Sequence, residues 1–340
     1  MQIKKFLAVV MSLCMAAGVV SYGSPVISQG IAAQAASFDG SFYSFDASTG
    51  VLTLKGNVNG DELRGLSDYF KAYVKFIMAE NGTVFPEDSS KLFYNFYNCV
   101  SIDISNADTS KVTDMSEMFS DCKKLSAIDV AGIDTSKVTN MGKMFINCLV
   151  MNTVDVSGFD TSKVTYMSEM FSNCNNLSAV DVSNFDTSAV TNMSEMFYYC
   201  KKLSSIDVSN FDTSNVTDMS NMFCLCLILP EVNVSGFDTS KVTKINSMFS
   251  NCCALTSIDV SKFDTSKVCD MFDMFGGCES LTELDVSGFD TSKVTSLENM
   301  FLNCSGLTTL DISSFDTSNR THEADARRQE TARVVPYYRR

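Results

Sequence analysis

An Asp-Thr-Ser triplet returns every 26 residues along most of this chain. It begins at Asp108 and recurs without a change of spacing as far as Asp316. A Phe-x-x-Cys pair keeps the same period, from Phe119 and Cys122 to Cys304. A fixed period of this length is typical of stacked structural units, because one such unit alone cannot bury its apolar side. The sequence therefore predicts a single repeat array with eight full units.

Within each unit, the apolar spacing changes from that of a strand to that of a helix. Leu203, Ile206 and Val208 are spaced as in a short strand, and the next turn contains Asp-Thr-Ser. A stripe with helical spacing follows: Val216, Met219, Met222, Phe223 and Cys226. We therefore expect a strand, a turn and about two turns of helix per unit, with rungs about 4.8 Å apart. The residues expected to be buried are Leu203, Ile206, Val208, Phe211, Met222, Phe223 and Cys226.

Residues 36–98 are expected to form a β-rich N-terminal capping module. The pattern predicts a hairpin over 41–58, a short helix near 63–70, a strand over 74–78 and a second helix starting at 89 or 90. Phe96 and Cys99 look like a shortened version of the repeat, with nine residues from Cys99 to Asp108 where later units have twelve. The solenoid is therefore predicted over residues 99–319, as this lead-in rung plus eight 26-residue units.

The unit L-x-x-I-D-V-S-x-F-D-T-S-x-V-T-x-M-x-x-M-F-x-x-C resembles the repeat of the BspA-like leucine-rich repeat surface proteins. The likeness covers about residues 91–319, and residues 45–54 resemble a short β-module found before such arrays. The resemblance implies an α/β fold: a right-handed leucine-rich-repeat-type solenoid, with a parallel strand face and short helices opposite. It also implies an exported bacterial protein, at the cell surface or secreted, and adhesion as the role of some members.

The two ends of the chain differ from the array. Residues 1–35 read as a signal peptide, with Lys4 and Lys5 before an apolar run and Ala33-Gln34-Ala35 as a cleavage pattern. A membrane anchor is the alternative, but the run is short for one, and no transmembrane segment is expected in the mature chain. Residues 320–340 abandon the repeat and are rich in arginine. We interpret them as a foreign, disordered tail, with a native basic tail as the alternative.

Composition excludes several classes of function. The only histidine is His322 and tryptophan is absent, which leaves little material for imidazole catalysis. The formal charge is −14; the tail carries six Arg and three acidic residues, a net charge of +3, which leaves −17 for residues 1–319. Such an acidic body argues against nucleic acid as a partner and favours basic proteins or divalent cations. No catalytic residue and no cofactor are predicted.

Cysteines stand in register along the array, and three interpretations are open for them. Disulfides between rungs are not forbidden by distance. A zinc site is disfavoured because the array has no C-x-x-C pair and no histidine. Each cysteine ends an inward apolar stripe, which favours free thiols in the core. We therefore predict no metal site, with nine cysteines, Cys99 included, in ladder register.

Strand alternation turns one column of aspartates away from the core. Its members are Asp129, Asp155, Asp181, Asp207, Asp259, Asp285 and Asp311, with Asn233 at the same position of one unit. Serines two residues later share this face: Ser157, Ser183, Ser209, Ser235, Ser261, Ser287 and Ser313. These columns are the candidate ligand-binding residues, because repeated like charges favour cations, basic groups or protonation of carboxylates. The alternative is a solvated face whose Asp and Ser bond within loops.

The aspartates of Asp-Thr-Ser are expected to fix turns instead. Taken together, the sequence predicts a non-catalytic, exported monomer that mediates adhesion or binds host or neighbouring-cell surface proteins through its strand face. A structural spacer or stalk that presents another module is the second hypothesis. An exported hydrolase is the third, and it lacks a distinct set of catalytic residues.

Overall fold

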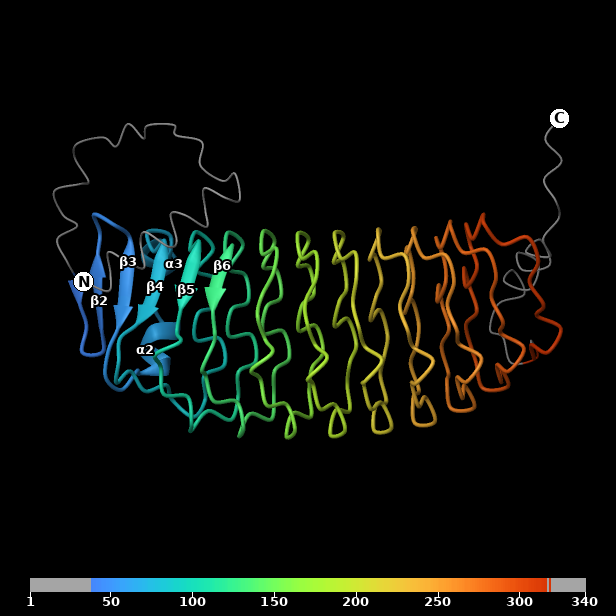
Figure 1. Ribbon diagram of the computed structural model, residues 1–340, viewed down its shortest axis with the longest axis horizontal. Helices are drawn as coiled ribbons and strands as arrows, with labels where there is room; N and C mark the ends of the chain where they lie inside the picture. The colour runs from blue at the N-terminus through green and yellow to red at the C-terminus, as the bar shows by residue number, and fades with distance from the viewer. Residues whose placement is uncertain (1–37, 317, 319–340) are drawn as a thin grey trace, which may run out of the picture.

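The computed structural model describes residues 38–316 and residue 318. They form an elongated solenoid in which each unit of the repeat makes one rung of the array (Figure 1). The expected solenoid is thus confirmed, while the signal peptide and the tail expected at 320–340 lie outside the described residues. In this part of the chain, no helix is long and apolar enough to cross a membrane.

The N-terminal end starts with an antiparallel hairpin, as predicted. Strand β1 (Phe38–Asp39) pairs with β2 (Tyr43–Asp46), which pairs with β3 (Val51–Leu54). At the β2–β3 turn, Ser48 donates from its N–H and its hydroxyl to the Asp46 carboxylate, at 2.9 and 2.6 Å. These local bonds explain why a short polar segment can reverse the chain here.

Two short helices and a strand complete this end. Helix α2 (Gly60–Arg64) is capped by Asn59, and α3 (Asp68–Lys71) is capped by Ser67. Both caps accept a bond from a backbone N–H of the first turn, which leaves one fewer unpaired donor at each helix start. Strand β4 (Phe76–Ala79) then pairs in parallel with β3.

One sheet runs from this N-terminal end into the first rungs. Strand β4 pairs in parallel with β5 (Ser101–Asp103), and β5 pairs with β6 (Ala127–Asp129), 26 residues on. Among the described residues β6 is the last strand of the sheet. Later rungs keep a backbone bond only where the strand segment begins, such as Ser204 N–H to the Ser178 carbonyl at 3.1 Å. The strand face is therefore only partly a hydrogen-bonded sheet.

The predicted helix opposite the strand face is wrong: consecutive tight turns take its place. In one unit, the Met222 N–H donates to the Met219 carbonyl three residues back, at 3.3 Å. The N–H groups of Asn221 and Phe223 instead donate to the next rung, to the carbonyls of Asn246 and Met248, at 3.0 and 2.9 Å. A helix would use these donors within its own segment. Here alternate N–H groups tie neighbouring rungs together.

Left-handed backbone conformations make this alternation feasible. Asn221 and Leu225 have φ of 57° and 63°, and equivalent residues of the other units share that conformation. Asparagine, aspartate and glycine adopt it at the lowest cost, which explains their frequency before the ladder cysteine. The column at the position of Leu225 consists of Asn95, Asp121, Asn147, Asn173, Tyr199, Leu225, Asn251, Gly277 and Asn303.

Stacked phenylalanine rings form the centre of the core. From Phe93 to Phe301, one ring per rung lies nearly parallel to the next, with centroids 5.3–6.0 Å apart and planes 4–13° apart. Because these rings occupy equivalent positions, their separation reports the rung spacing at the core. That spacing exceeds the 4.8 Å expected of paired strands, in keeping with the loss of the sheet after β6.

The stack also corrects the register of the first rung. Phe93, not Phe96, stacks on Phe119, at 5.6 Å. Phe96 therefore stands where the next rung has Cys122, and Cys99 stands where it has Leu125. The lead-in rung is not shortened, and the cysteine ladder has eight members, since Cys99 lies outside it.

The predicted core is confirmed at every position but one. Ile206 is only half-buried, because it lies on the strand side, where neighbouring rungs cover it incompletely. The residues found buried as expected are Leu203, Val208, Phe211, Met222, Phe223 and Cys226.

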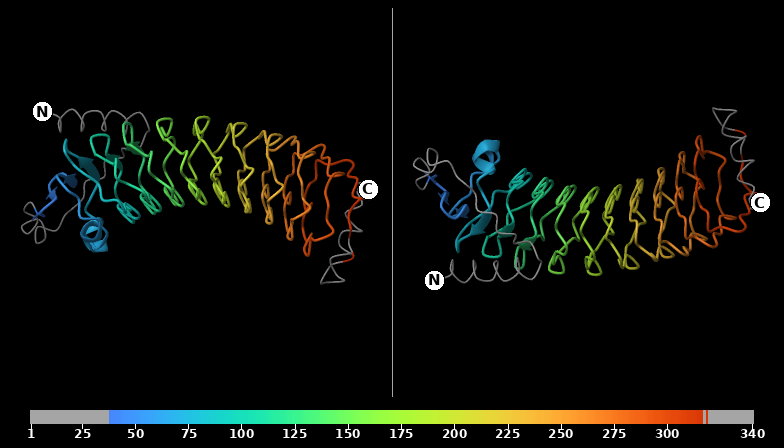
Figure 2. Two further views of the ribbon diagram at one scale, coloured as in Figure 1. Left: turned by 90° about the horizontal axis from the view of Figure 1, so that it is seen from below. Right: turned by 90° about the horizontal axis from the view of Figure 1, so that it is seen from above.

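The array bends along its length, and the strand side lies on the outside of the bend (Figure 2). The rungs are therefore closer together on the turn side, where backbone bonds join them, and farther apart on the strand side. Because the rungs are farther apart on the strand side, neighbouring strand segments are less closely packed there.

A substitution at Gly277 tests whether a side chain is strained in the left-handed column. The φ of Gly277 is 75°, and an added Cβ would lie 2.6 Å from an Asn251 oxygen. We expect Gly277→Ala to lower the free energy of unfolding by about 1–2 kcal/mol. The matched control is Gly158→Ala, where the Cβ meets nothing within 4 Å. Denaturant titration of both variants measures the difference, and equal stabilities would contradict a strained position at 277.

Candidate functional site: the acidic strand side

The predicted aspartate column lies on the surface of the strand side. All seven of its aspartates are exposed, as are most of the serines two residues later. In the middle of the array, the Asp207 carboxylate accepts bonds from the Ser209 N–H at 3.0 Å and from its hydroxyl at 2.6 Å. Such a double bond to one oxygen recurs in the rungs of Asp155, Asp181 and Asp259.

Variations between rungs show what this turn requires. Asp285 and Asp311 accept the backbone N–H of Ser287 and Ser313, each at 2.9 Å. Asp129 accepts from the N–H of Ala131, and Asn233 accepts both bonds from Ser235 through its amide oxygen. The turn therefore needs one acceptor oxygen and not a negative charge.

These bonds keep the carboxylates charged. Hydrogen bonds from the serine side chain, and then from its backbone N–H, lower the pKa of Asp155, Asp181, Asp207, Asp259, Asp285 and Asp311. Neighbouring carboxylates act in the opposite direction on Asp181 and Asp285, but more weakly. Bonding within each turn therefore outweighs repulsion between rungs, which favours charged carboxylates over the predicted alternative of a protonated column.

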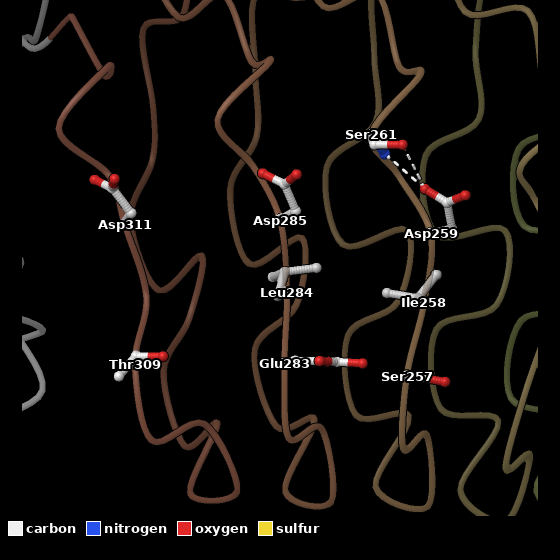
Figure 3. Close-up of a pocket in the computed structure, with 9 residues that line it drawn as sticks. All are labelled: Ser257, Ile258, Asp259, Ser261, Glu283, Leu284, Asp285, Thr309 and Asp311. Atoms are coloured by element: carbon white, nitrogen blue, oxygen red, sulfur yellow. Dashed lines mark hydrogen bonds between the residues drawn. The ribbon is translucent and has the colours of Figure 1, made fainter.

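A shallow groove of about 680 Å³ crosses the last rungs of this side. Asp259, Asp285 and Asp311 line one edge in a row, and Glu283 lies along the other (Figure 3). Between them lie Ile258 and Leu284, which are half-buried. The groove is completed by Ser257, Ser261 and Thr309.

Three of the predicted ligand-binding aspartates and one predicted serine thus share one groove. Their counterparts in earlier rungs lie along the same side without lining it. Sequence reasoning missed Glu283, Ile258, Leu284, Ser257 and Thr309. Strand alternation could have found Glu283, because it lies two residues before Asp285 and shares its outward face.

The aspartates of the Asp-Thr-Ser column fix turns, as predicted, and the threonines of this column also join rungs. Thr135 is 2% exposed. Its hydroxyl donates to the Asp160 carbonyl at 3.0 Å and accepts from the Asp160 N–H at 2.8 Å. The Ser136 N–H in turn donates to the Asp134 carboxylate at 2.9 Å. A buried threonine that serves both backbone groups of the next rung has a structural role.

The ladder cysteines are free thiols that also join rungs, and all of them are buried except the half-buried Cys304. The Cys226 sulfur donates to the Phe197 carbonyl of the preceding rung at 3.2 Å, and the other members make the same bond. Burial is the main reason that the pKa of Cys226 is raised. The members are Cys122, Cys148, Cys174, Cys200, Cys226, Cys252, Cys278 and Cys304. Over residues 38–316, no three Cys, His, Asp or Glu side chains are grouped to hold a metal ion.

Comparison with known proteins assigns the repeat to a family. Three overlapping segments, 87–180, 167–258 and 229–332, match the family described as "Mycoplasma protein of unknown function, DUF285". Together they span well over half of the chain. The chain belongs to the DUF285 family. A search of curated proteins finds no match.

Solved structures similar to this DUF285 member have low sequence identity to it, and two of them are leucine-rich repeat proteins. A leucine-rich repeat protein of T. pallidum is 18% identical, with a TM-score of 0.40, over 63% of this chain and 87% of its own. One from Eubacterium ventriosum is 17% identical, with a TM-score of 0.35, over 81% and 91%. An internalin of Listeria monocytogenes is 13% identical, with a TM-score of 0.25, over 77% and 86%.

Alkylation should separate the two kinds of cysteine in this protein. Cys269 is exposed, whereas Cys226 lies in the core. We expect native protein to be alkylated at Cys269 within minutes and at Cys226 only after unfolding, because a buried neutral thiol is unreactive. Mass spectrometry of the digested protein measures the extent of alkylation at both cysteines. Equal rates at both cysteines, or a native disulfide between ladder members, would overturn the core-thiol interpretation.

Proposed function

We propose that this DUF285 protein is an exported, BspA-like surface or secreted protein that binds other proteins through its strand side. Its partners are host or neighbouring-cell surface proteins that present basic segments. The observation that carries the proposal is the row of exposed carboxylates, one in nearly every rung, which the serine bonds keep charged. Such a surface attracts basic groups and repels acidic ones.

The same geometry supports a role without catalysis. The Ser209 hydroxyl donates to Asp207, whose pKa is lowered, and a carboxylate of low pKa is a weak general base. The rungs repeat this arrangement with no histidine beside it in the array. Repetition of a weak contact suits multivalent binding, where affinity grows with the number of rungs engaged.

Removing charge from the column tests the proposal. We expect Asp181→Asn, Asp207→Asn and Asp259→Asn together to weaken binding to extracellular proteins about tenfold, since each exposed ion pair contributes about 0–1 kcal/mol. The turns should survive, because Asn233 already accepts the same bonds. High salt should weaken binding by the unaltered protein and change little for the variant.

The matched control removes the same charge from the same rungs, at Asp186, Asp212 and Asp264 of the Asp-Thr-Ser column. Binding should be measured to an immobilised panel of host extracellular proteins, with melting temperature as the check on folding. If the strand-side variant binds as tightly as this control, the acidic side is not the binding surface, and the spacer hypothesis gains support.

A further inference from the structure

The groove of the last rungs has an apolar floor between charged edges. At the floor position, Val154, Val180 and Val232 of earlier rungs are buried, and Ile128 and Ile206 are half-buried but stand singly. Ile258 and Leu284 are half-buried in two successive rungs. Glu283 adds a carboxylate where the rungs on either side have Ser257 and Thr309. An aliphatic chain with a cationic end matches this combination, because it can cover the floor and reach an edge.

The charged side chains that line the groove are all acidic. Its lining holds four carboxylates, from Asp259, Glu283, Asp285 and Asp311, and no basic side chain. Lys262 lies outside the lining, and it affects Asp259 more weakly than the bonds from Ser261 do. In the Asp259 turn, one carboxylate oxygen holds both serine bonds and leaves the other available.

The spacing of the rungs indicates what shape of ligand fits. At the core, the last rings of the stack are 5.7–6.0 Å apart, and the strand side lies farther out on the bend (Figure 2). An extended polypeptide places every second side chain on one face, at intervals of about 6.6–6.8 Å. Successive carboxylates of the row therefore come close to the repeat of an extended chain that runs along the array.

We propose that the groove binds an extended segment of a partner protein that has arginine or lysine at every second position. The segment runs along the solenoid axis, across the strand segments of three rungs. Its basic side chains lay their stems over Ile258 and Leu284 and place their charged ends at Asp259, Asp285 and Asp311. This inference rests on the proposed function and adds the ligand class and its spacing.

Two peptides of equal composition and charge test the spacing directly. The first, Ser-Arg-Ser-Arg-Ser-Arg-Ser, has alternating arginines, and the second, Ser-Ser-Arg-Arg-Arg-Ser-Ser, has them clustered. Both are acetylated, amidated and labelled, and their affinity for the full chain is measured by fluorescence anisotropy at low salt. We expect the alternating peptide to bind about fivefold more tightly, because only its arginines can reach three carboxylates at once. Equal affinities would overturn the proposal.

Charge variants locate the site. Asp259→Asn, Asp285→Asn and Asp311→Asn together should weaken binding of the alternating peptide about tenfold or more. The control, Asp238→Asn, Asp264→Asn and Asp290→Asn, removes three exposed carboxylates that accept equivalent serine N–H bonds, and it should change affinity less than about twofold. Equal losses in the two variants would show general attraction to an acidic protein and would contradict a groove site.

The outcomes separate this inference from the proposed function. If the two peptides bind alike while strand-side substitutions still abolish binding of whole proteins, the spacing argument is wrong and the proposed function stands. If whole proteins bind the strand-side variant normally, the proposed function is wrong, whatever the peptides show.

Discussion

Backbone hydrogen bonds between rungs, on the side opposite the strands, are the interaction on which this structure depends. Alternate N–H groups, such as those of Asn221 and Phe223, point along the array and donate to the next rung. Residues in the left-handed conformation make that alternation feasible. Because the bonds repeat from rung to rung as far as Gly277, they set a common register for the phenylalanine stack, the buried threonines and the cysteine ladder.

The consequences appear on the opposite side. After β6 the strand segments are joined by few backbone bonds, so the rungs separate there and the array bends (Figure 2). Local bonds such as those from Ser209 to Asp207 hold the strand-side turns, and only some turns also bond to a neighbouring turn, as Asn210 does to the Ser183 carbonyl. The outward aspartates therefore bond within their own turn and do not join rungs, and their charge is available to a ligand. Where the separation exposes Ile258 and Leu284, the same side acquires a groove.

Much of the architecture could be predicted from the period of the sequence alone. A constant 26-residue interval places equivalent residues in line, so the array, the core phenylalanines and the aspartate column all follow from it. The lead-in rung was misjudged because Phe96 and Cys99 imitate the Phe-x-x-Cys spacing. The ring contact between Phe93 and Phe119, which are 26 residues apart, reveals the true alignment.

The tight turns opposite the strand side and the groove could not be predicted from the period, for different physical reasons. Inward spacings of three, three, one and three residues fit a helix and a pair of tight turns equally well. The asparagine before many ladder cysteines, as at Asn147 and Asn173, was the signal for the turns. The groove depends on the bend of the whole array, a property that no single unit contains.

Amide hydrogen exchange, resolved by residue in the native protein, tests the central claim most directly. The account predicts strong protection for the N–H groups of Asn221 and Phe223, which donate to the next rung. It predicts fast exchange for those of Ile206 and Asp207, on the strand side of the same unit, where no such bond forms. Equal protection on the two sides would contradict it, because the rungs would then be held by a continuous sheet.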